Sequence, residues 1–482
     1  MKLKELLQGV DVLNMQADPE MEITDVVYDS RKKDVKPGSL FLAISGFTFD
    51  GNDYIPAMLE KGAVVAVTEK TPKWENVPYV QVASARLALA QIGANYFSQP
   101  ARAFQLIGVT GTNGKTSVTL LLKHILETTL GAKVGLIGTT GNLIGDTLIE
   151  TERTTPESFE LQALFAQMRD AGCTHVVMEV SSHAIALDRV GGITFDVAAF
   201  TNLTEDHLDF HKTMENYCDT KAELFARCRR SVINRDDEWY DRISAKAAPD
   251  HLTTSVTQAA GLQAKDLELL SDGIAFTAVC GEKESRVELP IPGKFTVYNA
   301  LTVLGIGVQL GLPLADCAKA LKTAKGVKGR VEVVPTPGKP YTVLIDYAHT
   351  PDGLENVLSS VKGFCKGRLI AVFGCGGDRD PIKRPIMGRI GVEIADHCII
   401  TSDNPRTEEP MAIISDILKG VAPEYKNYEV IENRIKAIHH AMDIAENRDI
   451  IVLAGKGHET YQEINGVKHH LDEREVVADY LK

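Results

Sequence analysis

A glycine-rich segment at residues 108–117, GVTGTNGKTS, has the residue types that hold phosphate groups. Glycines let backbone N–H groups turn toward phosphate oxygens, Lys115 adds positive charge, and Thr116 offers a hydroxyl to Mg²⁺. An apolar stretch precedes the segment and an apolar-periodic stretch follows it, as in a strand, loop and helix. Five residues rather than four separate Gly108 from Gly114, so the loop is a variant. We predict an ATP-binding loop formed by Gly111, Thr112, Asn113, Gly114, Lys115, Thr116 and Ser117.

Acidic and imidazole side chains follow the next apolar strands. Glu179 lies in MEVSSH, and Asp206 and His207 lie in TNLTEDHLDFH. An open α/β sheet presents ligands at the carboxyl ends of its strands, so these three residues are candidate ligands for one or two Mg²⁺ ions. Asp209 and His211 stay ambiguous on pattern alone.

Lys221 lies in the helical stretch ENYCDTKAELFARC. Taken alone, it is predicted to be an ordinary solvated charge on a helix. A lysine facing a metal cluster would be repelled unless it were neutralised or chemically converted, and carbamylation would make it an anion.

Three polar motifs in the last third of the chain each follow an apolar strand: GGDRD (376–380), SDNPRTEEP (402–410) and AGKGHE (454–459). Their side chains should converge at one sheet edge and form a pocket for a small polar molecule. Arg379 and Arg406 can each grip a carboxylate, and Asp403 and Glu459 can take an ammonium, which describes an amino-acid site. Surface salt bridges and an Asn-Pro turn are the alternative.

The elements that position these motifs predict an α/β protein of three domains, since 482 residues are too many for one core. Residues 1–98 alternate short strands and helices and begin with a short amphipathic helix over 1–14. Residues 99–329 form a parallel, doubly wound sheet with polar strands over about 250–292 and two helices after them. Residues 330–482 restart the alternation and resemble a nucleotide-binding fold.

Composition excludes several classes of protein. The net charge of −13 opposes a nucleic-acid-binding surface, and no apolar run reaches the length of a signal peptide or a membrane span. The eight cysteines are scattered and should be reduced thiols. We therefore expect a cytoplasmic protein, acting as a monomer, with no nucleic-acid or membrane partner.

The motifs TGTNGKT, MEVSSH, TNLTEDHLDFH, YxxxKxxLF at 217–225, YNA at 298–300, DNPR and GKGHE together resemble the Mur ligase family along the whole chain. The resemblance implies a uridine-nucleotide domain, a central ATPase domain and a Rossmann-like domain for the incoming amino acid. It also implies ATP-driven addition of meso-diaminopimelate to UDP-N-acetylmuramoyl-L-alanyl-D-glutamate through an acyl phosphate.

The resemblance further implies roles for individual residues. Lys115, Glu179, His207 and carbamylated Lys221 would be catalytic, and Thr116 would join the last three as metal ligands. The other implied ATP contacts are Asn299, Arg330 and Asp346, with His349 nearby. The UDP-muramoyl-dipeptide would meet Ser30, Thr48, Thr154, Thr155, Ser181 and Arg189. Diaminopimelate would meet Arg379, Asp403, Asn404, Pro405, Arg406, Gly455 and Glu459.

The sequence departs from the family pattern at Leu187, where a polar glutamine is common, and at the FTF stretch over 47–49. Four alternatives stay open: a lysine-adding ligase, a folylpolyglutamate synthetase, a regulatory P-loop NTPase and an inactive binding protein. Arg406 favours meso-diaminopimelate over lysine, because a lysine side chain would place a cation against its guanidinium.

Overall fold

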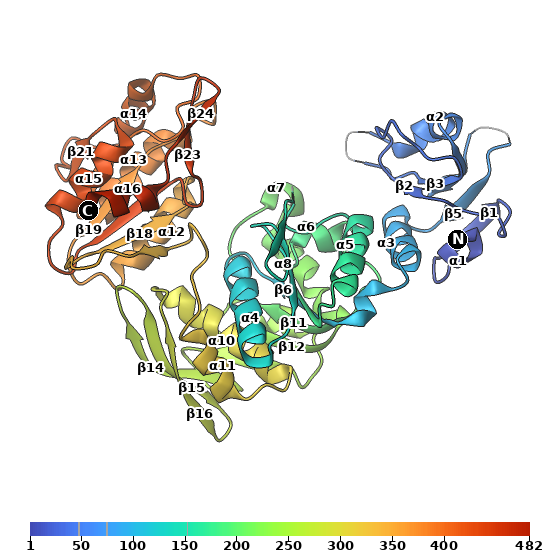
Figure 1. Ribbon diagram of the computed structural model, residues 1–482, viewed down its shortest axis with the longest axis horizontal. Coiled ribbons are helices and arrows are strands. Elements are labelled where there is room, and N and C mark those ends of the chain that lie inside the picture. The colour runs from blue at the N-terminus through green and yellow to red at the C-terminus, as the bar shows by residue number, and fades with distance from the viewer. Residues whose placement is uncertain (47–48, 74–75, 152) are drawn as a thin grey trace. The chain divides into compact units, whose positions relative to one another are not determined.

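The computed structural model describes residues 1–46, 49–73, 76–151 and 153–482. It divides into two compact units, one formed by Met1–Thr254 with Gly305–Leu312, the other by Ser255–Leu304 with Pro313–Lys482. Each unit is built from layered strands and helices (Figure 1), which confirms the predicted α/β class. Among the described residues, no helix is long and apolar enough to cross a membrane.

The first unit opens with a five-stranded sheet, in the spatial order β1 (Val12–Gln16), β5 (Tyr79–Val82), β4 (Ala63–Thr68), β3 (Ser39–Leu42) and β2 (Val26–Val27). Helices α1 (Leu3–Leu6) and α3 (Ala85–Tyr96) bury apolar side chains against one face, and α2 (Ile55–Glu60) covers the other. The helix predicted over 1–14 is wrong beyond Leu6. Gly9 turns the chain with a φ of 76°, and β1 then pairs with β5.

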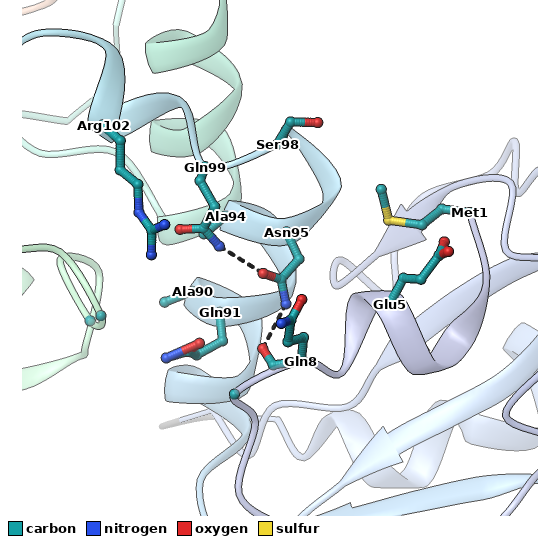
Figure 2. A pocket seen from close by; sticks show the side chains of 13 residues that line it. Met1, Glu5, Gln8, Ala90, Gln91, Ala94, Asn95, Ser98, Gln99 and Arg102 are labelled. Carbon is teal, nitrogen blue, oxygen red and sulfur yellow. Dashed lines mark hydrogen bonds between the residues drawn. The ribbon is translucent and has the colours of Figure 1, made fainter.

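Amide side chains join α3 to the end of α1 and to the segment that follows α3. Asn95 donates from Nδ2 to the carbonyls of Leu6 and Gln8, both at 2.8 Å, and Gln99 Nε2 donates to Asn95 Oδ1 at 2.7 Å. They line a polar cavity of about 480 Å³ together with Arg102, as Figure 2 shows.

The second sheet has a parallel core in the order β13 (Leu252–Ser255), β12 (Cys228–Asn234), β11 (Phe195–Phe200), β6 (Gln105–Thr110), β10 (His175–Glu179) and β7 (Val134–Ile137). This confirms the predicted parallel sheet. Two short antiparallel strands, β8 (Asn142–Ile144) and β9 (Thr147–Ile149), extend one edge. The helices of this region are α4 (Lys115–Leu130), α5 (Ser158–Asp170), α6 (Ser182–Ala186), α7 (Leu208–His211), α8 (Met214–Ala222) and α9 (Tyr240–Ser244).

The second unit begins with an antiparallel meander of β14 (Leu262–Leu269), β15 (Ile274–Cys280) and β16 (Lys283–Leu289). These are the polar strands predicted within 250–292. The two predicted helices follow as α10 (Lys294–Gln309) and α11 (Leu314–Leu321). Apolar α11 residues pack inward because they recur at helical spacing.

The last sheet has six strands in the order β17 (Glu332–Val334), β18 (Thr342–Asp346), β22 (Ile450–Ala454), β19 (Leu369–Phe373), β20 (His397–Ile400) and β21 (Tyr428–Val430). All neighbours are parallel except β17 with β18. One face packs against α12 (Pro351–Lys362), α13 (Lys383–Ile394) and α14 (Pro410–Leu418), and the other against α15 (Arg434–Ile444) and α16 (Glu473–Tyr480). A hairpin of β23 (Tyr461–Ile464) and β24 (Val467–His470) completes this doubly wound layer.

Candidate active site

The phosphate loop (residues 108–117) joins the end of β6 to the start of α4. Gly111 has a φ of 146° and Gly114 a φ of 86°. A Cβ at Gly111 would lie 1.9 Å from Thr201 Oγ1, so the close approach of these two chain segments requires glycine. The glycine positions predicted from sequence are therefore built into the shape of the loop.

The segment that follows β11 supports the loop from one side. Asn202 accepts from the backbone N–H of Thr112 through its carbonyl at 2.8 Å, and from that of Asn113 through Oδ1 at 2.9 Å. Thr201 Oγ1 donates to the carbonyl of Asn113 at 2.6 Å. Sequence reasoning missed Thr201 and Asn202, although they open the polar TNLT run at the end of a buried strand.

Lys115 folds back over the loop that precedes it. Its Nζ donates to the carbonyl of Gly111 at 2.9 Å and to that of Thr112 at 2.8 Å. The ammonium group is therefore held at the phosphate loop, where it can offset the charge of a nucleotide phosphate.

Glu179, at the end of β10, is only 1% exposed. One carboxylate oxygen accepts from Thr116 Oγ1 at 3.0 Å and from the backbone N–H of Thr139 at 2.9 Å, and the other accepts from Thr139 Oγ1 at 3.2 Å. The structure thus brings Thr116 and Glu179 together as predicted. Thr139 was missed, because it lies after β7 in a segment with no chemical motif.

Lys221 is only 1% exposed, so the residue-based prediction of a solvated helix charge is wrong. Its Nζ donates to the carbonyl of Gly111 at 2.9 Å and lies 4.6 Å from the centre of the Tyr217 ring. Burial, together with the positive charge of Lys115, holds the pKa of Lys221 well below its usual range. Tyr217 and Lys221 are four residues apart on α8, which directs both toward the loop.

Histidines gather beside α7. The ring centres of His183 and His207 lie 4.9 Å apart, and His207 Nδ1 is 3.4 Å from Asp206 Oδ1. His211 Nε2 lies 2.9 Å from Ser182 Oγ, and burial lowers the pKa of His211 to about 4. His183 was missed by sequence reasoning. Within the described parts of the chain, no group of three or more His, Cys, Asp and Glu side chains could by itself hold a metal ion.

Most residues predicted for the muramoyl-dipeptide surround the end of β10. Thr155 Oγ1 donates to the carbonyl of Glu179 at 2.8 Å and accepts from the N–H of Ser181 at 3.3 Å. Arg189 Nη1 donates to the carbonyl of Thr155 at 3.2 Å, and Thr154 Oγ1 lies 3.0 Å from Thr139 Oγ1.

The two residues predicted for the uridine end are not in this group. Ser30 lies just after β2 of the first sheet and is half-buried. Thr48 lies outside the residues that the structure describes.

The remaining residues predicted for ATP belong to the second unit. Asp346 ends β18 and accepts from the N–H groups of Val331 and Ala348, both at 2.8 Å, and burial raises its pKa. The Arg330 guanidinium lies 5.5 Å from the centre of the Tyr347 ring. Asn299 is buried on α10.

Arg406 adopts a left-handed backbone conformation, with a φ of 52°, where the DNPR motif leaves β20. Its Nε donates to Glu463 Oε2 at 3.2 Å and its Nη1 donates to the carbonyl of Gly377 at 2.8 Å. A Cβ at Gly377 would lie 1.9 Å from the Pro405 carbonyl oxygen, so the GGDRD and DNPR motifs pack in direct contact. Arg379 is exposed beside them.

Asp403, Asn404 and Glu459 converge from the ends of β20 and β22. Asn404 Nδ2 donates to Glu459 Oε2 at 2.9 Å. Among the described atoms, the buried Asp403 Oδ2 has no hydrogen-bond partner, and a Cβ at Gly455 would lie 2.6 Å from it. The predicted convergence of the three motifs at one sheet edge is confirmed, and it leaves one buried acceptor without a hydrogen-bond partner among the described atoms.

These features define an α/β protein with a glycine-rich loop of the kind that holds phosphate groups and, at the edge of its last sheet, a cluster of side chains with charges of both signs. Three family models match successive parts of the chain: "Mur ligase family, catalytic domain" at 22–97, "Mur ligase middle domain" at 109–307, and "Mur ligase, glutamate ligase domain" at 329–457. The chain belongs to the Mur ligase family.

Individual relatives agree with the family models. The UDP-N-acetylmuramoyl-L-alanyl-D-glutamate–2,6-diaminopimelate ligase 1 of Clostridium acetobutylicum is 47% identical over 484 residues, covering 100% of this chain and 99% of the relative. A solved structure of a UDP-N-acetylmuramoyl-L-alanyl-D-glutamate–2,6-diaminopimelate ligase is 32% identical, with a TM-score of 0.79 and coverage of 100% and 98%. A Mycobacterium tuberculosis folylpolyglutamate synthase complexed with ADP and AMPPCP is 20% identical, with a TM-score of 0.59 and coverage of 77% and 92%, and shares the fold.

Proposed function

We propose that this chain is an ATP-dependent ligase that joins meso-diaminopimelate to the D-glutamyl carboxylate of UDP-N-acetylmuramoyl-L-alanyl-D-glutamate, a step of peptidoglycan precursor synthesis. The observation that carries the proposal is the grouping of Arg406, Asp403 and Glu459 at one sheet edge, which offers both signs of charge to an amino acid. The 47% identity over the whole chain to a relative named for this reaction supports the proposal. With the folylpolyglutamate synthase the chain shares only the fold.

A carboxylate does not react with an amine at neutral pH, because its carbonyl carbon is electron-rich and oxide is a poor leaving group. In the proposed reaction a carboxylate oxygen attacks the γ-phosphorus of ATP, the bond to the bridging oxygen breaks, and ADP leaves. The amine then attacks the acyl carbon, loses a proton, and displaces phosphate. Lys115 would offset charge on the phosphoryl group as it moves.

The donor atoms around the phosphate loop fit Mg²⁺. Thr116 and Glu179 place a hydroxyl and a carboxylate oxygen 3.0 Å apart, and Mg²⁺ is commonly held by one or two carboxylates together with substrate phosphates. We infer that they would hold one ion, and that His207 and a carbamylated Lys221 would hold a second. Bound Mg²⁺ would supply neutralisation of phosphate charge.

Lys221 has the surroundings that carbamylation needs. An uncharged amine can add to CO₂ with loss of a proton, and the burial that lowers the pKa of Lys221 favours the uncharged amine. Carbamylation would add a carboxylate-like group at the Nζ atom that now donates to the Gly111 carbonyl.

We further propose that the nucleotide substrate is bound by Ser30, Thr48, Thr154, Thr155, Ser181 and Arg189. We also propose that the functional domains are residues 1–98, 99–329 and 330–482, and that the protein acts as a cytoplasmic monomer. The grouping of Thr155, Ser181 and Arg189 at the end of β10 supports the first of these assignments.

The test is amino-acid-dependent phosphate release. Purified protein with Mg²⁺, ATP and UDP-muramoyl-dipeptide should release phosphate rapidly with meso-diaminopimelate and slowly with lysine or with no amino acid. Absence of release in all three reactions would refute the ligase assignment.

A further inference from the structure

The amino-acid pocket is backed by charged side chains that protein encloses completely. Arg434, Lys456 and Glu473 are each at most 1% exposed. Burying a charge is costly unless it is paired and hydrogen-bonded, so each of these groups needs specific partners. Lys456 has Asn404 and Glu459 of the proposed amino-acid site as partners, whereas Arg434 and Glu473 pair with each other.

Lys456 determines which way the Asn404 side-chain amide points. Asn404 Oδ1 accepts from Lys456 Nζ at 3.0 Å and from the N–H of Glu463 at 2.9 Å. Because two donors meet at this oxygen, the amide nitrogen must lie on the other side, where it donates to Glu459 at 2.9 Å.

The same lysine orients the carboxylate of Glu459. Lys456 Nζ donates to Glu459 Oε2 at 3.2 Å, and the Asn404 amide donates to the same oxygen. Both bonds fall on Oε2 and neither occupies Oε1, so Oε1 can accept from a ligand ammonium.

Arg434 and Glu473 fix the strand ends from which this arrangement starts. Arg434 Nε donates to Glu473 Oε1 at 2.8 Å, and Nη2 donates to the carbonyl of Ala454 at 2.8 Å. Arg434 Nη1 also lies 3.8 Å from Asp403 Oδ2. One guanidinium thus connects the end of β22 with the acidic residue that follows β20.

The charges of this cluster (Asp403, Arg434, Lys456, Glu459 and Glu473) do not cancel. Three carboxylates face two cations, which leaves one negative charge in excess inside the protein. An ammonium group bound at the pocket would balance that excess, and the buried Asp403 Oδ2 has no hydrogen-bond partner among the described atoms.

We propose that Lys456 is a positioning residue for the incoming amino acid, which holds the Glu459 carboxylate, directly and through Asn404, in the orientation that receives its ammonium group, while Arg434 and Glu473 hold the strand ends. The inference rests on the proposed function, because it concerns the amino-acid substrate of the same site.

The test compares Lys456→Met with Lys468→Met in the full-length protein. Lys468 is an exposed lysine whose Nζ lies 4.2 Å from the centre of the Tyr461 ring, the same ring that Lys456 Nζ approaches at 5.8 Å. Loss of hydrogen bonds between charged groups should raise the KM for meso-diaminopimelate at least about tenfold in K456M. The KM for ATP and the kcat at saturating substrate should stay within about threefold, and K468M should match the unaltered protein.

An unchanged KM for meso-diaminopimelate in folded K456M, or equal increases in both KM values, would overturn the proposal. Thermal melting checks the fold, and if K456M does not melt cooperatively, Lys456→Gln, which keeps one donor, is judged by the same criterion. Inactivity of the unaltered protein with meso-diaminopimelate would instead refute the proposed function, so the two failures are distinguishable.

Discussion

Thr116 Oγ1 donates to Glu179 Oε1 at 3.0 Å, although 63 positions separate the two residues in the chain. The contact joins the first turn of α4 to the end of β10 and forms the oxygen pair that we assign to Mg²⁺. Glu179→Gln should lower kcat by about 100-fold or more, because an amide lacks the charge that a hard cation requires. It should also raise the Mg²⁺ concentration needed for half-maximal phosphate release.

The control for this prediction is Glu223→Gln, which alters a surface carboxylate paired with Lys246. E223Q should retain normal activity and Mg²⁺ dependence. An E179Q variant with the same Mg²⁺ dependence as E223Q would remove Glu179 from the metal site.

Gly111→Ala should abolish nucleotide binding and destabilise the protein. The added Cβ would meet Thr201 Oγ1 at 1.9 Å, and the φ of 146° is unfavourable for alanine. Gly131→Ala is a matched control, since this glycine has a φ of 61° at the end of α4 but no atom lies within 4 Å of its Cβ position. G131A should cost only about 1 kcal/mol in unfolding free energy and bind ADP normally in calorimetry. Normal ADP affinity in G111A would contradict the assigned loop.

The phosphate loop was predictable because its information is local. Glycines at fixed spacing, a lysine and a hydroxyl residue follow one another within a single turn, and the apolar pattern identifies the strand and the helix on either side. The carboxyl ends of parallel strands lie at one edge of a sheet as a general rule, so the approach of Glu179 to Thr116 could be expected.

The support for these groups was not predictable, since it depends on contacts between distant segments. Asn202, Thr139 and Lys456 each form a hydrogen bond with a site residue. Thr139 lies in a stretch with no motif, and the motifs that contain Asn202 and Lys456 do not indicate which residue these two side chains support. The prediction from residue type alone placed Lys221 in solvent and was wrong. Lys221 and Tyr217 lie on one face of α8, and that face is buried because the phosphate loop packs against it, a contact between distant segments.

Carbamylation of Lys221 should be detectable by its dependence on CO₂. Activity should fall when CO₂ and bicarbonate are removed from the assay and return when bicarbonate is added. Native mass spectra should show the added mass of CO₂, lost on acidification and missing from Lys221→Ala. The surface variant Lys246→Ala should keep both the adduct and the activity. Full activity of the protein without CO₂ would exclude a functional carbamate.

Arg406 should determine the preference for meso-diaminopimelate over lysine. Its guanidinium is held by Glu463 and the Gly377 carbonyl, and it would pair with the distal carboxylate that lysine lacks. Arg406→Ala should reduce kcat/KM for meso-diaminopimelate by about 100-fold, as expected for loss of a charge-assisted pair. Lysine turnover should change far less. An equal reduction of kcat/KM for both amino acids would show that Arg406 does not bind the distal carboxylate.

His211 should make stability depend on pH. Burial lowers its pKa from 6.5 to about 4, so between these values the unfolded chain binds a proton that the folded protein does not. The free energy of unfolding should therefore fall as pH falls through this window, by no more than a few kcal/mol, and the His211 contribution should be constant above it. Urea unfolding of His211→Gln should show a shallower fall than that of the unaltered protein. The control variant His469→Gln, at an exposed position, should show the same dependence of unfolding free energy on pH as the unaltered protein. If H211Q also shows that dependence, His211 is not the group responsible for it.

In the proposed reaction the phosphate loop activates a carboxylate for amide-bond formation. Isotope transfer tests it most directly: UDP-muramoyl-dipeptide with heavy oxygen in its D-glutamyl carboxylates is turned over with ATP, Mg²⁺ and meso-diaminopimelate, and the released phosphate is analysed by mass spectrometry. An acyl phosphate requires one heavy oxygen in each phosphate released, because the carboxylate oxygen that attacks the γ-phosphorus leaves with it. Phosphate containing only oxygen from ATP and water would contradict the account.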